Sequence, residues 1–153
     1  MAVFDKLFRK WKPKDSKRKL IRAWKKDGNK IGLLYFYCHA NGTRLSFGLD
    51  DEISTSDLRL ELKREGASLE NPPCLVFLNG CHTAVGESTG GFLAATGGQG
   101  FCGFIGTEAK IPDLFAMRFG LALLHELFTR DLPVRDIMQE LHRKHWPLSI
   151  VIT

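Results

Sequence analysis

Three short apolar runs constrain the fold of this chain most strongly. They cover residues 32–38 (GLLYFYC), 74–78 (CLVFL) and 100–107 (GFCGFIGT), and glycine or proline stands at or beside at least one end of each. Each run has the length of a β-strand and lacks the alternation of apolar and polar residues that a strand with one solvated face shows. Such runs are typical of parallel strands that are buried on both faces.

Segments with helical patterns alternate with these strands. Ser56 is expected to cap a helix that runs to about Glu65, and a short helix is expected at about residues 91–95. Residues 112–128 are apolar nearly all round, which predicts a buried helix, and Pro133 can start an amphipathic helix with Val134, Ile137, Met138 and Leu141 on one face. Residues 43–49 (TRLSFGL) read as an edge strand or hairpin arm, and residues 147–153 (PLSIVIT) as a final strand. Strands that alternate with helices predict an α/β fold with a mostly parallel sheet and helices on both faces.

The first 27 residues are expected to form a separate basic, amphipathic helical segment. Residues 1–30 hold twelve Lys/Arg against three Asp. The apolar residues repeat with helical spacing and are Phe4, Leu7, Phe8 and Trp11, followed by Leu20, Ile21 and Trp24. Two interpretations stay open, since residues 3–26 could contact an anionic membrane or acidic partner, or could pack on their own domain with the lysines in water. Nucleic acid is a weaker candidate, because the aromatic residues repeat helically rather than forming a stacking platform.

The cysteine content and the hydropathy pattern point to the cytoplasm. The four cysteines are too few and too irregularly spaced for a disulfide scaffold, and we expect Cys74 and Cys102 to be core residues. No apolar run reaches the length of a membrane span, and the first residues lack the apolar stretch of a signal peptide.

Two potentially reactive side chains follow the first two predicted strands. His39 follows the strand at 32–38, and Cys81 follows the strand at 74–78 after an Asn79-Gly80 turn. Parallel strands end at the same edge of a sheet, so both residues are expected there, in loops. A thiol and an imidazole are the minimum apparatus for thiol catalysis. The residues alone leave this interpretation balanced against two buried, inert side chains.

A zinc site is the weaker alternative for the same region. Cys38, His39, Cys81 and His82 provide two thiols and two imidazoles. However, neighbours in an extended strand point to opposite faces, and structural zinc sites space the ligands of each pair two to four residues apart. We therefore expect no metal and no other cofactor, and we leave His82 as a turn residue.

Three blocks of the sequence resemble the signature blocks of CHAT-domain peptidases, in order and spacing. They are YFYCHANG, LVFLNGCHTA and GFIGTEAKIPD, and the resemblance covers roughly residues 20–152. This family belongs to the caspase–metacaspase–separase group of cysteine proteases. The resemblance implies a caspase-like α/β domain over residues 28–153, shortened at both ends relative to the family. It also implies that Cys81 is the nucleophile and His39 the catalytic histidine.

The resemblance assigns further roles around this pair. It implies an oxyanion site made of backbone amides, from Cys81 and from Ala40, Asn41 and Gly42. The family usually follows its histidine directly with glycine, so this chain departs from the pattern at Ala40-Asn41-Gly42. Asn79 and Asp113 match positions that resemble the lining of the family's specificity pocket, and Glu108 lies close to Asp113 in the sequence.

The expected function is that of a cytosolic cysteine endopeptidase with a protein or peptide substrate. Carboxylates in the pocket favour a cationic residue before the cut, so we expect cleavage after Arg or Lys. Asp113 has an alternative role, as an acidic residue in the first turn of the helix that begins near Pro112. The alternative for the whole chain is a catalytically inactive CHAT-like interaction module. Such a module would recruit regulatory proteins or anionic surfaces through the basic N-terminal segment.

Overall fold

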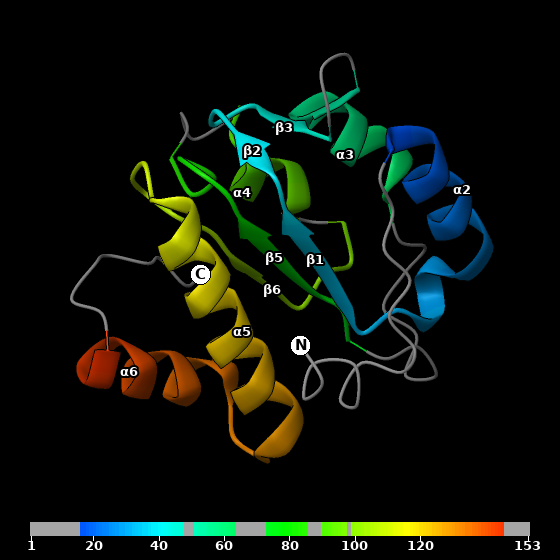
Figure 1. Cartoon of the computed structure of the whole chain (residues 1–153). Helices are drawn as coiled ribbons and strands as arrows, with labels where there is room; N and C mark the ends of the chain where they lie inside the picture. Colours follow the sequence, from blue (N-terminus) through cyan, green and yellow to red (C-terminus); the bar gives the residue numbers. More distant parts are fainter. Residues whose placement is uncertain (1–15, 48–50, 64–72, 86–89, 98, 146–153) are drawn as a thin grey trace. The chain divides into compact units, whose positions relative to one another are not determined.

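The computed structural model describes residues 16–47, 51–63, 73–85, 90–97 and 99–145 (Figure 1). These residues belong to two compact units, residues 16–111 and residues 112–145. Helix α2 (Lys17–Asp27) belongs to the first unit, together with all the strands of the described residues. The apolar set from Phe4 to Trp11 and the predicted strand at 147–153 lie outside the described residues.

A parallel sheet of three strands confirms the predicted α/β class. It consists of β1 (Leu33–Tyr37), β5 (Leu75–Asn79) and β6 (Gly103–Ile105) in the order β1-β5-β6, and both neighbouring pairs are parallel. The third strand is shorter than the apolar run that predicted it. Cys102 precedes β6 and is exposed, so its prediction as a core residue was wrong.

A small antiparallel sheet follows β1 immediately. It consists of β2 (His39–Ala40), β3 (Arg44–Ser46) and β4 (Glu52–Ser54), in that order. The edge strand or hairpin arm predicted at 43–49 is confirmed as β3 over residues 44–46, and residues 48 and 49 lie outside the described part of the chain. His39 was expected in a loop, but its backbone pairs with Ser46 and therefore lies in a strand.

Short helices connect the strands of this unit. Helix α3 (Thr55–Glu61) starts and ends earlier than predicted, because Ser54 and not Ser56 is its N-cap. The Ser54 hydroxyl accepts a hydrogen bond from the Asp57 backbone N–H at 3.1 Å, and the Asp57 carboxylate accepts one from the Ser54 backbone N–H at 2.9 Å. This reciprocal capping box satisfies two backbone donors at the helix start. Helix α4 (Phe92–Thr96) lies where a short helix was predicted, and a 3₁₀ turn, η1 (Gly28–Lys30), follows α2.

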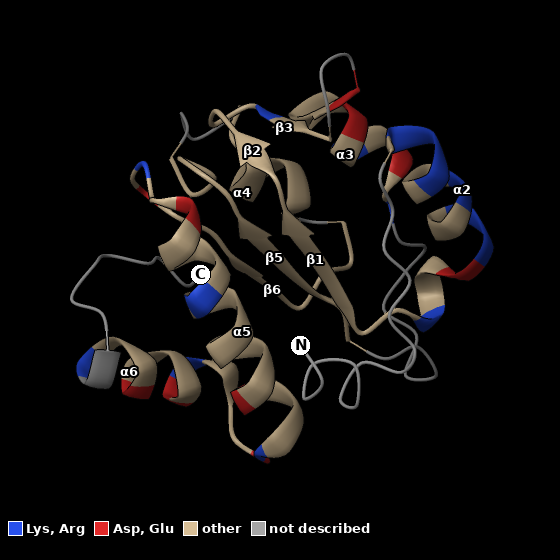
Figure 2. Ribbon diagram, in the orientation of Figure 1, with Lys and Arg blue, Asp and Glu red and all other residues tan. Residues whose placement is uncertain are grey.

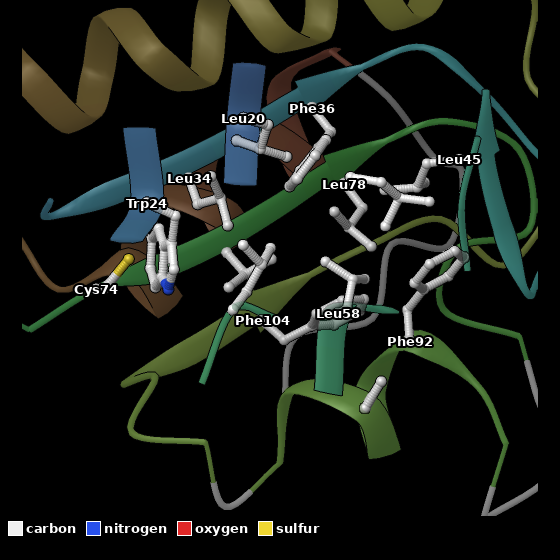
Figure 3. Close-up of a cluster of buried hydrophobic side chains, with 14 residues drawn as sticks. Leu20, Trp24, Leu34, Phe36, Leu45, Leu58, Cys74, Leu78, Phe92 and Phe104 are labelled. Atoms are coloured by element: carbon white, nitrogen blue, oxygen red, sulfur yellow. The ribbon is translucent and has the colours of Figure 1, made fainter. Parts of the chain in front are cut away.

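The main core of the first unit lies between one face of the parallel sheet and these helices (Figure 3). Aligned positions on the three strands, Leu34, Val76 and Phe104, are all buried in it. Figure 3 shows Leu20 and Trp24 of α2 pointing into this core, and the Trp24 ring centroid lies 5.6 Å from that of Phe101. The apolar face of α2 therefore packs on its own domain, which confirms that interpretation for the described part of the basic segment.

The opposite face of the sheet carries the next aligned row, Tyr35, Phe77 and Ile105. Phe77 and Ile105 are fully buried, and the rings of Tyr35 and Phe77 lie 4.9 Å apart between centroids. The strands are therefore apolar on both faces, which is why their sequences show no alternation.

The second unit contains α5 (Asp113–Thr129) and α6 (Val134–His145). Only one side of α5 is buried, with Ala116, Phe119, Leu123 and Leu124, whereas Leu114, Met117, Leu121 and Phe128 are exposed by between 42% and 54%. The prediction of a helix buried all round was therefore wrong. The amphipathic prediction for α6 is confirmed, because Ile137, Met138 and Leu141 are buried. Among the described helices, none combines the length and apolar character needed to cross a bilayer.

Candidate functional site

The ends of β1 and β5 place His39 and Cys81 at equivalent positions. Tyr37 pairs with Asn79 as the last residues of the two parallel strands. His39 and Cys81 each follow this pair by two residues. Both residues therefore lie just beyond the carboxyl edge of the sheet, after neighbouring strands that are about 4.8 Å apart.

Two glycines show that the segments after these strands lie side by side. A Cβ atom on Gly80 would come within 2.7 Å of the Cys38 carbonyl oxygen and 3.0 Å of Ala40 Cβ, so no larger residue fits there. Gly42 has a φ of +66°, and a Cβ atom on it would lie 3.4 Å from the Val85 carbonyl oxygen. Residues 38–42 and residues 80–85 are thus in direct contact, with His39 on one segment and Cys81 on the other.

The chain turns sharply directly after Cys81. His82 adopts a φ of +56°, a conformation that few residues other than glycine take. Its backbone N–H donates to the Ala109 carbonyl at 3.2 Å, and its ring nitrogen Nδ1 lies 3.4 Å from the Glu108 carbonyl oxygen. His82 is therefore a turn residue, as predicted, and the loop after β6 holds this turn in place.

Two buried threonines fix the turn from the inside. The Thr83 hydroxyl donates to the Leu78 carbonyl at 2.8 Å and accepts from the Thr107 backbone N–H at 2.9 Å. The Thr107 hydroxyl donates to the carbonyl of Gly80, the residue before Cys81. Both side chains are at most 2% exposed, so these bonds form away from water, where an unmade hydrogen bond is costly. Neither threonine was predicted as a site residue, although Thr83 stands two positions after Cys81 and Thr107 ends the third apolar run.

The Cys81 side chain is half-buried, and its thiol lies 3.7 Å from the Ile111 carbonyl oxygen, within hydrogen-bonding reach for sulfur. His39 is exposed. The structure describes both side chains, and they do not hydrogen-bond to each other in it.

Asn41 organises the hairpin between His39 and β3. Its side-chain oxygen accepts hydrogen bonds from the backbone N–H groups of Thr43 at 3.3 Å and Arg44 at 3.0 Å. Its own backbone N–H donates to the Arg44 carbonyl at 3.1 Å. Because hydrogen-bonded and non-bonded pairs alternate in an antiparallel ladder, the next pair, Ala40 with Leu45, leaves the Ala40 N–H pointing away from β3.

The cysteines differ strongly in environment, and no disulfide joins any of the four. Burial raises the pKa of the Cys38 thiol to about 11, against a smaller lowering by a hydrogen bond with the Ser46 backbone. Cys74 is fully buried.

Within the described part of the chain, no group of three or more His, Cys, Asp or Glu residues is placed to hold a metal ion.

The predicted pocket residues occupy unlike positions. Asn79 is only 1% exposed, and its side-chain N–H donates to the Tyr35 hydroxyl at 3.0 Å. Burial raises the pKa of Tyr35 to about 12, and the bond to Asn79 opposes that shift. In this structure the Asn79 side chain is therefore engaged with Tyr35 of the neighbouring strand and is not exposed to a substrate.

The two carboxylates of the pocket prediction are both exposed. Glu108 belongs to the loop after β6 that contacts His82. Asp113 is the first residue of α5 and an acidic residue in its first turn, which agrees with the alternative role given to it from the sequence. It belongs to the second unit, and Glu108 to the first.

Comparison with models of protein families and with curated proteins finds no match to this chain.

Proposed function

We propose that this protein is a cysteine endopeptidase in which Cys81 is the nucleophile and His39 the general acid–base. The observation that carries the proposal is the contact of residues 38–42 with residues 80–85 at the carboxyl edge of the sheet, anchored at Gly80. Its second support is the resemblance of the sequence blocks around His39, Cys81 and Thr107 to CHAT-domain peptidases.

The chemistry requires only these two side chains and a water molecule. His39 accepts the proton of the Cys81 thiol, and the thiolate attacks the carbonyl carbon of the scissile peptide bond. The tetrahedral intermediate collapses when imidazolium donates its proton to the leaving amine, which leaves a thioester on Cys81. Water, deprotonated by His39, then hydrolyses the thioester and restores the thiol. In the free protein the Cys81 thiol is directed at the Ile111 carbonyl, so substrate binding has to turn it toward His39.

Backbone amides near Cys81 are suited to stabilise the oxyanion. The Asn41 N–H is already used by the hairpin, which removes it from the set that the sequence suggested. The N–H groups of Cys81, Ala40 and Gly42 remain as candidates. Rigid donors of this kind lower the energy of the tetrahedral intermediate without reorganising during the reaction.

The side chain before the cut is proposed to be Arg or Lys. Glu108 is an exposed carboxylate on the loop that supports the Cys81 turn. A cationic side chain would pair with it, whereas an acidic one would be repelled. With Asn79 buried, Glu108 is the pocket candidate that belongs to the same unit as Cys81.

A peptide library incubated with the purified full chain tests the activity. We expect cleavage after Arg or Lys, loss of all cleavage in Cys81→Ala, and at least a roughly hundredfold loss in His39→Ala, since a general base contributes on that scale. Glu108→Gln should weaken cleavage after Arg or Lys more than it weakens cleavage elsewhere. His142→Ala is the matched control for His39→Ala, because His142 is an exposed histidine of the second unit. Cleavage that persists in Cys81→Ala, or equal losses in both histidine variants, would refute the dyad.

The inactive interaction module is the second candidate, and one observation favours it. The thiol of Cys81 is bonded to Ile111 rather than to His39 in the free protein. Under this alternative, no peptide in the library is cut by the wild-type chain, although the fold and the partner-binding surface are intact.

A further inference from the structure

An open groove of about 540 Å³ runs along α2, on residues of the helix that do not point into the core. Its lining includes Lys17, Arg18, Arg22 and Lys25, with Ile21 and Asp51 as the other residues. Figure 2 shows how densely Lys and Arg cover this helix. The lining therefore holds four cationic side chains and one carboxylate.

The two lysines of the groove are already neutralised within the chain. Lys17 Nζ lies 2.8 Å from an oxygen of Asp57, and Lys25 Nζ lies 2.7 Å from an oxygen of Glu61, so both lysines pair with α3. Asp51 is also engaged, because its carboxylate accepts a hydrogen bond from the Lys17 backbone N–H at 3.0 Å.

Arg18 and Arg22 are different. Both are exposed, and in the described part of the chain neither forms an ion pair. They stand four residues apart on one helix face, where two like charges disfavour the helix unless an anion lies between them. A guanidinium presents a planar set of N–H donors that matches a carboxylate.

The chemistry of the groove favours a peptide over a membrane or a nucleic acid. The large apolar residues of α2, Leu20 and Trp24, are buried in the core, so this helix has no apolar face left to insert into a bilayer. Among the described residues, no aromatic side chain lines the groove, and nucleic-acid bases would lack a surface on which to stack. Ile21 gives the groove an apolar contact beside the two arginines.

We propose that this groove binds an acidic peptide segment of a partner protein, with carboxylates on Arg18 and Arg22 and an apolar side chain on Ile21. This binding site is separate from Cys81 and His39 and does not depend on catalysis. The proposed site gives α2 a binding role on its basic face, while the apolar face of the helix packs in the core.

The probe is a short fluorescein-labelled peptide of Glu, Asp and Leu, titrated with the full chain in a Cys81→Ala background so that no cleavage interferes. We expect saturable binding by fluorescence anisotropy that weakens between about 50 mM and 300 mM NaCl, because exposed charges are screened. Arg18→Glu/Arg22→Glu should weaken binding at least about tenfold. Arg18→Gln/Arg22→Gln should also weaken it, with less risk to the helix.

Lys26→Glu/Lys30→Glu is the matched control. It makes the same change in net charge at exposed residues that do not line the groove. Less than about twofold weakening is expected from it, since long-range attraction alone is small at physiological salt. Thermal melting of each variant checks that the fold persists. Equal weakening by both Glu pairs, no binding by the parent protein, or sedimentation with phosphatidylserine vesicles in place of peptide binding would overturn the proposal. The peptide-binding result is independent of whether the wild-type chain cleaves any substrate.

Discussion

Cys81 and Cys102 are both accessible to some degree, but only Cys81 follows the strand next to the one that His39 follows. Iodoacetamide reacts with thiolates, so a cysteine activated by a neighbouring imidazole is alkylated fastest. Near neutral pH we expect Cys81 to be labelled first, then Cys102, with Cys38 and Cys74 last because both are shielded. Mass spectrometry of tryptic peptides measures the four rates. His39→Ala should slow Cys81 by about tenfold and leave Cys102 unchanged. If Cys102 is labelled first and the labelling rate of Cys81 is the same in His39→Ala as in the wild type, the dyad is not formed.

The buried thiol of Cys38, again a single residue, should make the free energy of unfolding depend on pH. Burial raises the pKa of its thiol to about 11 in the folded chain, above the ordinary value of 9.0. The folded state therefore favours the protonated thiol. The free energy of unfolding keeps the full contribution of this thiol below pH 9 and loses it as the pH rises toward 11. In urea titrations, the free energy of unfolding of the wild type relative to Cys38→Ser should fall by about 2 kcal/mol between pH 8 and 11. A difference that stays constant over this range would show that Cys38 is not buried as described.

At the scale of single elements, α3 shows how a cap sets a helix boundary. Ser54 and Asp57 exchange hydrogen bonds at its start, whereas Ser56 is an exposed residue inside the first turn. Ser54→Ala should lower the free energy of unfolding by about 1 kcal/mol. Ser56→Ala, the matched control, should change it by less than about 0.5 kcal/mol, because alanine is a good helix former. Circular dichroism during urea unfolding measures both. A larger loss in Ser56→Ala would place the cap where the sequence first suggested it.

At the scale of the first unit, α2 is held to the parallel sheet by Trp24. Its side chain is 5% exposed and belongs to the same core as strand residues Leu34 and Phe104. Trp24→Ala should lower the free energy of unfolding by about 3–5 kcal/mol, since a large aromatic side chain leaves a cavity in a packed core. Lys26→Ala, an exposed change two residues away, should have little effect. A loss below about 1 kcal/mol for Trp24→Ala would mean that α2 is not part of this core.

The local pattern of the sequence was enough to predict most elements of the fold. The apolar runs around Leu34 and Val76 predicted parallel strands because residues buried on both faces leave no alternation to observe. The helical spacing of Ile137, Met138 and Leu141 likewise predicted the buried face of α6. The placement of His39 and Cys81 at one edge of the sheet also followed from the sequence, once the strands were taken as parallel, whereas the structure established that the two strands are neighbours.

Only the tertiary structure decided how the site is supported. The Asn79 amide donates to the Tyr35 hydroxyl, two residues before its pairing partner Tyr37 on the adjacent strand, and such a diagonal contact depends on register rather than on local pattern. Thr83 and Thr107 act together although 24 positions separate them, and the backbone groups to which each side chain hydrogen-bonds are set by the packing of two loops. Composition made α5 look buried all round, but exposure depends on how much surface its neighbours cover. Periodicity is a local property of a chain, whereas pairing, burial and hydrogen bonding between distant segments arise only when the chain is folded.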